Sequence, residues 1–136
     1  CGGCQAFGEM LVAGVEDDAE RRTSEVQFWD FRRFPVQVTP MTIPRSGAEK
    51  VSTAGAIGMT SLGKGAALAV ATWDARTIDF YVSEDDPFVG ARLVPRFTWR
   101  DDEADRTGWI DSNFGNYQTV NLVTQRDGQR CHHRRL

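Results

Sequence analysis

An internal repeat constrains this chain of 136 residues more than any other feature of its sequence. Leu11–Asp17 (LVAGVED) aligns with Leu68–Asp74 (LAVATWD), and Val26–Phe31 (VQFWDF) aligns in the same order with Ile78–Ser83 (IDFYVS). The offsets are 57 and 52 residues, and a longer polar loop, DDAERRTSE, absorbs the difference in the first copy. Self-similarity of this kind indicates that the chain is built from repeated supersecondary units.

Each copy contains four stretches with the composition of β-strands, which are short, rich in β-branched and aromatic residues, and separated by turn residues. No stretch keeps apolar residues at helical spacing. Tight turns such as Gly63-Lys64-Gly65 predict antiparallel neighbours. The strands expected in the first copy are Gly3–Glu9, Met10–Val15, Glu25–Phe31 and Val36–Ile43, and those in the second are Ala54–Ser61, Ala66–Trp73, Thr77–Val82 and Arg92–Trp99.

Alternation within the second copy predicts which side chains share a buried face of each strand. The three expected faces are Leu68, Val70 and Thr72; Ile78, Phe80 and Val82; and Leu93, Phe97 and Trp99.

A third copy is expected to begin near the C-terminal end. Tyr117–Gln129 fits Ala54–Ala66, and Cys4–Glu9 matches Ala56–Ser61 in position. The next strand does not follow, because QRCHHRRL places charge and imidazole where an apolar strand is needed. We therefore expect a fragment with a frame-shifted end, or else an intact basic tail. The expected units are residues 3–44 and 54–100 as the two four-stranded copies, 101–116 as a connecting loop, 117–129 as the first strand of a third copy, and 130–136 as the tail.

Four-stranded repeats of about 40 to 60 residues are typical of propeller blades. The element FWDFRRFPVQV (Phe28–Val38), a strand ending in an aromatic residue and Asp before a turn containing Pro, resembles bacterial β-propeller repeats of the LVIVD or WD-repeat-like kind. The similarity extends from Gly3 to about Gln129, although Tyr81-Val82 replaces Trp29-Asp30 in the second copy. It implies an all-β fold of about two blades and the start of a third. A small β-sandwich or an open barrel is the alternative.

Composition and charge exclude several function classes. The net charge of -3 gives no positive field for a nucleic-acid backbone. No apolar run reaches the length of a membrane span, and the first residues given lack the charged and apolar regions of a signal peptide. The propellers that the chain resembles are common in exported bacterial proteins, which favours a secreted or periplasmic location.

The cysteines and histidines raise the question of a metal site. Cys1, Cys4, Cys131 and either His132 or His133 are residue types that bind zinc. Their spacing is not diagnostic, and a redox pair would need to precede a helix, whereas a strand follows here. We expect Cys4 to be a small packed residue.

The repeat places two acidic residues at equivalent positions. Asp17 and Asp74 both follow the second strand of their copy, on the loop face where propellers usually bind ligands, with Arg76 close by. They are expected to bind a divalent cation such as calcium or a basic partner, or else to close their own turns. The long connection from Asp101 to Gln118 joins the same face. Its composition suits carbohydrate or peptide contact, or a self-packed loop, through Trp109, Asn113, Asn116 and Gln118.

These observations predict noncatalytic binding of a protein, peptide or carbohydrate at the loop face, with no cofactor. The alternative is a propeller hydrolase, lactonase-like or phosphatase-like, that holds a divalent cation between Asp17 and Asp74. A purely structural spacer is the third possibility. The familiar nucleophile, metalloprotease and nucleotide-binding motifs are absent from the sequence.

Overall fold

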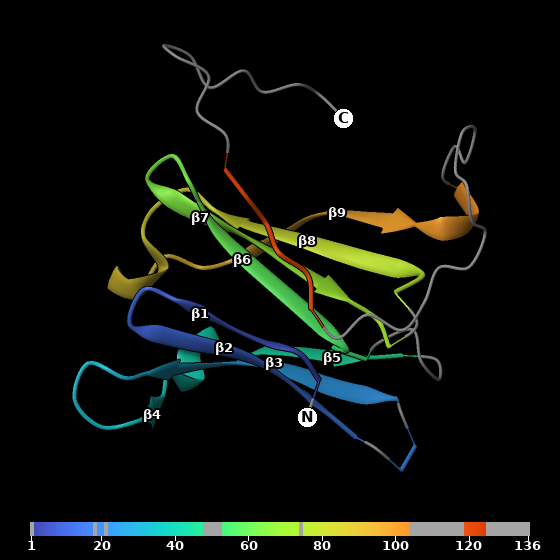
Figure 1. Ribbon diagram of the computed structural model, residues 1–136, viewed down its shortest axis with the longest axis horizontal. Coiled ribbons are helices and arrows are strands. Elements are labelled where there is room, and N and C mark those ends of the chain that lie inside the picture. The colour runs from blue at the N-terminus through green and yellow to red at the C-terminus, as the bar shows by residue number, and fades with distance from the viewer. Residues whose placement is uncertain are drawn as a thin grey trace.

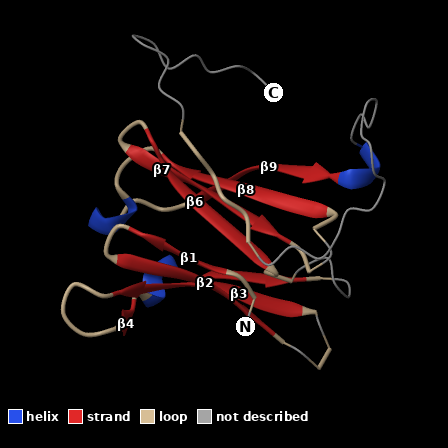
Figure 2. Cartoon of the chain, viewed as in Figure 1, coloured by secondary structure: helices blue, strands red, loops and turns tan. Residues whose placement is uncertain are grey.

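A computed structural model of the chain describes residues 2–17, 19–20, 22–47, 53–73, 75–103 and 119–124. The fold is all-β, as the sequence predicts, and consists of two antiparallel sheets that pack face to face (Figures 1 and 2). Each sheet is a blade-like unit of strands in sequence order. Within the described residues, no strand closes the two sheets into a ring.

The first sheet contains five strands. β1 (Cys4–Phe7), β2 (Met10–Glu16) and β3 (Thr23–Asp30) form a meander, and β3 then pairs with both β4 (Val36–Gln37) and β5 (Ile43–Ser46). The β1–β2 turn has only two residues, Gly8 and Glu9. Gly8 has a φ of 59°, a left-handed conformation that glycine adopts without steric cost.

The second sheet contains four strands in the order β6 (Ala56–Leu62), β7 (Gly65–Ala71), β8 (Thr77–Ser83) and β9 (Val94–Arg100). Gly63, with a φ of 61°, makes the β6–β7 turn in the same way. The described helices are three 3₁₀ turns of three residues each, η1 (Thr39–Met41), η2 (Pro87–Val89) and η3 (Asp101–Glu103). None of them is long enough to cross a membrane.

The hydrogen-bond registers confirm two of the three aligned strand pairs. Gly14 lies opposite Val26, and Ala71 lies opposite Ile78, which preserves the offsets of 57 and 52 residues. The first strands are aligned one residue differently from the prediction. Because Cys4 faces Ala13 and Ile57 faces Val70, Cys4 corresponds to Ile57 and not to Ala56. The β6–β7 hairpin is longer, and this extra length obscured the register.

The expected strand Val36–Ile43 was wrong as a single element. After Val38, whose N–H donates to the Phe28 carbonyl at 2.7 Å, the chain leaves the sheet in η1 and rejoins it as β5. Pro40 lies in this turn and has no N–H to give to a strand ladder.

The expected buried face of Leu93, Phe97 and Trp99 was wrong as a single face. Leu93 precedes β9 and packs against the core between the sheets, whereas Phe97 is half exposed, because the β8–β9 register shifts at Phe80/Tyr81.

The main core lies between the two sheets. Sheet 1 contributes Met10, Val12, Val26 and Phe28, and sheet 2 contributes Ile57, Met59, Leu68, Val70 and Tyr81. The sheets approach closely at Gly14, where an added Cβ would come within 2.2 Å of the Ala54 carbonyl oxygen.

Polar contacts join the same two sheets. The Gln5 amide donates to the Met59 carbonyl at 2.9 Å and accepts from its N–H at 2.8 Å, and the Glu16 carboxylate accepts from the Ala54 N–H. A buried ion pair adds to them. The Arg45 guanidinium on β5 lies 2.7 Å from Asp79 Oδ2 and donates to the Tyr81 hydroxyl at 3.1 Å, both on β8.

The described part of the expected third copy, residues 119–124, lies along β6 but forms no strand there (Figure 1). Val120 packs against Ala56 and Ala71, and the Thr124 hydroxyl donates to the Ser61 carbonyl at 2.5 Å. The remainder of residues 117–129, the tail 130–136 and most of the connection 101–116 lie outside the described residues.

Candidate functional site

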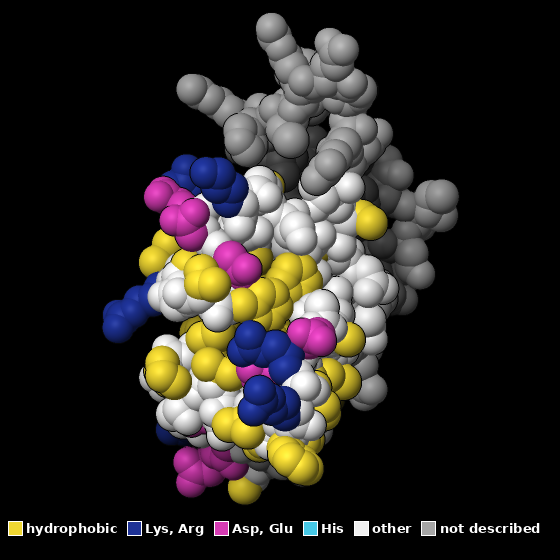
Figure 3. Space-filling model, turned by 90° about the vertical axis from the view of Figure 1, so that its left-hand side faces the viewer, with side chains coloured by type: hydrophobic (Ala, Val, Ile, Leu, Met, Phe, Trp, Pro, Cys, Tyr) yellow, Lys and Arg dark blue, Asp and Glu magenta, His cyan; other side chains and the backbone are white. Residues whose placement is uncertain are grey.

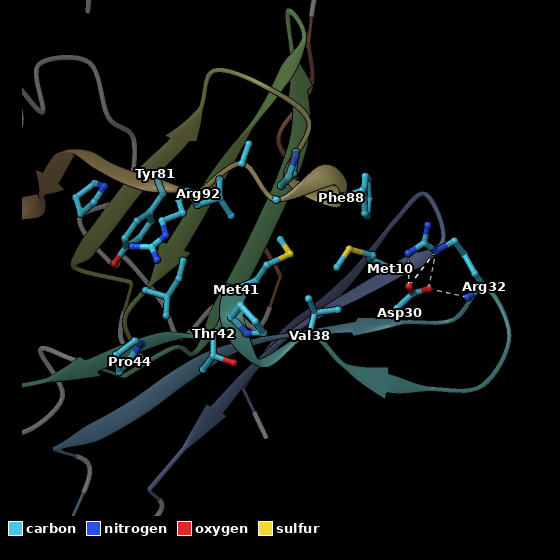
Figure 4. A pocket seen from close by; sticks show the side chains of 17 residues that line it. Met10, Asp30, Arg32, Val38, Met41, Thr42, Pro44, Tyr81, Phe88 and Arg92 are labelled. Carbon is cyan, nitrogen blue, oxygen red and sulfur yellow. Dashed lines mark hydrogen bonds and ion pairs between the residues drawn. The ribbon is translucent and has the colours of Figure 1, made fainter.

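A cleft of about 730 Å³ opens between the two sheets, at the end that carries the β1–β2 turn, the β3–β4 loop and the β8–β9 connection. Figure 3 views the molecule from this side and shows hydrophobic side chains gathered between charged ones. Figure 4 shows that the lining side chains come from both sheets. The apolar lining includes Met10, Val38, Met41, Ile43, Phe88 and Leu93.

Two 3₁₀ turns account for the opening. η1 projects from sheet 1 where Pro40 breaks the strand, and η2 projects from sheet 2 in the β8–β9 connection. η2 is well fixed, because the Asp86 carboxylate accepts from the Phe88 N–H at 2.8 Å and the Phe88 ring stacks on Phe7 at 5.6 Å. Both turns therefore line the cleft, and the inner strands β1 and β6 pack against each other beside it.

The floor of the cleft is buried and its rim is charged. Met10 and Tyr81 lie at the floor and are almost completely buried. The charged lining residues are Asp30, Arg32 and Arg92. Arg92 is exposed, and its guanidinium makes no hydrogen bond or ion pair with any residue that the structure describes.

Asp30 and Arg32 form a tight pair at the rim (Figure 4). The Arg32 Nε donates to both oxygens of Asp30, and Nη2 donates to Oδ2 at 2.5 Å. The Asp30 carboxylate also accepts from the Arg32 backbone N–H at 2.9 Å. These hydrogen bonds stabilise the ionised carboxylate and therefore lower the pKa of Asp30 below its ordinary value of 3.8.

We expect acid to weaken the contribution of this ion pair to stability. Because the pKa of Asp30 is lowered in the folded chain, its stabilising effect is complete above pH 3.8 and is lost as the pH falls through the lowered pKa. A carboxyl carbon NMR titration should give Asp30 a midpoint below 3.8. In Arg32→Gln the midpoint should move back up, and an unchanged midpoint would show that Arg32 is not the cause.

The residues predicted from the sequence lie elsewhere. β2 runs from Met10 in the cleft to Glu16, so Asp17 lies at the far end of the sheet from the cleft. Asp17 Oδ1 accepts from the Ala19 and Glu20 N–H groups at 3.0 and 3.3 Å, as expected of a carboxylate that closes its own turn. Arg76 Nη1 lies 4.0 Å from Asp101 Oδ2.

No described contact joins Asp17 to Arg76. The other predicted site residues, Asp74, Trp109, Asn113, Asn116 and Gln118, lie outside the described residues. Binding at the loop face therefore stays a prediction.

Cys4 differs from its expectation. It was expected to be packed, but it is exposed, because it lies on the face of β1 opposite to Gln5, whose side chain contacts sheet 2. The other proposed zinc ligands, Cys1, Cys131, His132 and His133, lie outside the described residues. In the part of the chain that the structure describes, no three Cys, His, Asp or Glu side chains gather as a metal site would require.

The sequence offered one weak signal for the cleft. Pro40 and Pro87 mark the two turns that hold it open, and each could have indicated a break in a strand. The apolar lining residues give no such signal, because they resemble ordinary core residues.

Comparison with protein-family models, with curated proteins and with solved structures finds no match to this chain. Its function is therefore inferred from the geometry of the cleft. The cleft is apolar, joins both sheets and has charged groups at its rim.

Proposed function

We propose that the two sheets are adjacent blades of a β-propeller and that the chain is a noncatalytic binding unit. The packing of the sheets supports the first part. Val12 of sheet 1 and Leu68 of sheet 2 lie in the same core. They are not equivalent positions of the repeat, because Val12 corresponds to Ala69 and Leu68 corresponds to Leu11. Non-equivalent faces thus pack head to tail, the arrangement that radial repetition of blades uses.

The position of the inner strands supports the same assignment. β1 lies beside β6, with the Gly3 N–H donating to the Gly55 carbonyl at 2.8 Å. Residues 119–124 lie beside β6 on its other side, where Gly58 allows the Val120 carbonyl to approach. Each repeat therefore places its first segment next to that of its neighbour, as the blades of a propeller do around a central axis.

The cleft carries the proposal of binding. Its volume of about 730 Å³ lies within the usual range for ligand pockets, and such pockets combine an apolar lining with a few polar groups. Met10 and Met41 add adaptable thioether side chains that suit varied apolar ligands. We infer a ligand that inserts an apolar side chain or ring, as a protein or peptide partner would.

The geometry supports binding over hydrolysis. Of the residues that the structure describes, Asp30 is the one carboxylate that lines the cleft, and Arg32 holds it. Asp17 is occupied by the backbone of its own loop. The predicted hydrolase would need Asp74 as well, which lies outside the described residues.

The three methionines of the chain allow a direct test. Met10 and Met41 line the cleft, whereas Met59 lies in the core between the sheets. With carbon-13 in the methionine methyl groups, we titrate the chain with the apolar dye 8-anilinonaphthalene-1-sulfonate. The Met10 and Met41 signals should shift in a saturable way while the Met59 signal stays fixed.

A matched pair of variants locates the binding. Ala91→Trp places a large ring on the cleft lining and should weaken dye binding, whereas Val123→Ser alters an exposed residue outside the cleft and should not. Equal shifts of all three methyl signals, or unchanged affinity in Ala91→Trp, would contradict binding in the cleft.

A further inference from the structure

The β3–β4 loop, Phe31–Pro35, presents apolar side chains to solvent. Phe34 is 81% exposed, Phe31 is 49% exposed, and Val36 follows directly at the start of β4. Loops between strands are usually polar, and exposed aromatic side chains that gather together mark interaction sites.

This loop is held in a defined conformation. The Asp30 carboxylate binds Arg32 through its side chain and its backbone, and the Phe31 N–H donates to the Glu9 carbonyl at 2.9 Å. Pro35 fixes the next backbone dihedral, and β4 pairs with β3 immediately afterwards. Phe34 is thus exposed on an ordered loop, which reduces the entropy lost when it binds.

The loop and the cleft lie at the same end of the molecule. Asp30 and Arg32 line the cleft, and with Arg33, Phe34 and Val36 they also line a second hollow of about 660 Å³. The Asp30–Arg32 pair therefore separates an apolar cleft from an exposed aromatic loop.

The two sides of this end differ in charge. The loop side is neutral overall, because Glu9 and Asp30 balance Arg32 and Arg33, whereas the β8–β9 connection has three carboxylates and Arg92. The loop side has Arg32 and Arg33, and Arg33 makes no hydrogen bond or ion pair with any described residue. The β8–β9 connection, which lines the opposite side of the cleft, begins with the exposed residues Glu84, Asp85 and Asp86.

We propose that this end is a self-complementary surface on which two copies of the chain associate, with Phe34 of each copy inserted into the cleft of the other. A two-fold contact would bring the loop of one copy against the β8–β9 connection of the second. Arg33 would then face the acidic residues 84–86 as Phe34 enters the cleft. This proposal rests on the cleft being a binding site and names its occupant.

The charge of this end favours a protein partner over a membrane. Residues 8–9, 30–35 and 84–93 contain three arginines and five carboxylates. A surface with this balance is not attracted to anionic lipid, which basic clusters bind. Arg33 on one side and the three carboxylates Glu84, Asp85 and Asp86 on the other instead suit a partner with the same groups in reverse order, which a second copy provides.

Sedimentation equilibrium of the full chain tests the proposal. The wild type should show a monomer–dimer equilibrium, and Phe34→Ser should weaken the dimer by about 30-fold or more, the change expected for loss of a hot-spot side chain. Phe97→Ser, which alters another exposed aromatic residue, should leave the dimer intact. A wild type that stays monomeric to millimolar concentration, or a dimer that survives Phe34→Ser, would overturn it.

Charge exchange gives a second test that does not depend on Phe34. Arg33→Glu, and separately the double variant Glu84→Arg with Asp85→Arg, which leaves the Asp86 cap of η2 in place, should each weaken self-association, whereas a mixture of the two should form a heterodimer. If the mixture associates no more tightly than either variant alone, the β3–β4 loop of one copy does not face the β8–β9 connection of the other.

The two proposals fail in different ways. Dye binding to monomeric Phe34→Ser measures the cleft alone. If the dye shifts the methyl signals of Met10 and Met41 but the wild type is monomeric, the self-association proposal fails and the proposed function stands. Binding of anionic vesicles through Phe34, without dimer formation, would show that this end is a membrane contact and would also reject the second copy.

Discussion

Replacing Arg45 with methionine is expected to lower the free energy of unfolding by about 3 kcal/mol, the lower end of the range for breaking a buried ion pair. Only 5% of the Arg45 side chain is exposed, and its guanidinium joins sheet 1 to Asp79 and Tyr81 of sheet 2. Without it, the Thr98 hydroxyl, which donates at 2.5 Å, is the one partner that the described residues leave to the Asp79 carboxylate, and it is neutral. Urea denaturation measures the change.

A double-mutant cycle with Asp79→Asn separates the ion pair from the loss of packing. The neutral amide that Asp79→Asn introduces needs no cation beside it. Arg45→Met should therefore lower the free energy of unfolding much less in the Asp79→Asn variant than in the wild type, and the coupling energy between the two positions should be about 1 to 3 kcal/mol. Additive effects, or a loss below about 1 kcal/mol in Arg45→Met, would show that the pair does not hold the sheets together.

Replacing Phe28 with alanine is expected to lower the free energy of unfolding by about 3 to 5 kcal/mol. Phe28 is the largest of the fully buried side chains, and it extends from β3 into the core between the sheets. Its removal leaves a cavity in the interface that both sheets need for their apolar faces. The measurement is again urea denaturation, with circular dichroism to confirm that the variant folds.

Phe97→Ala is the matched control for Phe28→Ala. Phe97 is half exposed on β9 and stacks on Phe80 with ring centroids 4.4 Å apart. Loss of this pair should cost only about 1 kcal/mol, as aromatic pairs at the surface do. If the two alanine variants were equally unstable, the assignment of the core to the space between the sheets would be wrong.

The strands could be predicted because their signals are local. Alternating apolar residues in Leu68–Val70 and Ile78–Val82, together with turn glycines such as Gly63, specify strands and tight turns within a few residues. The repeat offsets of 57 and 52 residues then assigned equivalent strands, and the registers confirm them.

The sequence-based predictions were wrong where the local sequence pattern was ambiguous, or where the outcome depended on contacts between residues far apart in the sequence. Val36–Ile43 has a strand-like composition, and only Pro40 marks the 3₁₀ turn that interrupts it. Leu93 follows the parity of Phe97 and Trp99, but the register shift opposite Phe80/Tyr81 moves it to the other face. Cys4 was expected to be packed as part of a strand, but it is exposed. The sequence could not show this, because the exposure of Cys4 depends on which face of β1 meets β6.

The candidate site was missed for the same reason. The repeat directed attention to Asp17 and Asp74 because equivalent sequence positions are visible in the chain, and Asp17 lies at the end of β2 far from the cleft. The cleft at the opposite end has no counterpart in the repeat. It is formed by η1 of one sheet and η2 of the other, and the residues that line it come from five separate parts of the sequence.

The sequence by itself determined an all-β chain of two repeated antiparallel units, since alternation and turn chemistry act between near neighbours. Only the tertiary structure decided that non-equivalent faces of the two sheets meet and that Arg45 joins Asp79 between them. It alone showed that two proline-containing turns hold a cleft open beside Phe34. These features depend on contacts between residues tens of positions apart, and apolar packing, being non-directional, leaves no local pattern from which they could be read.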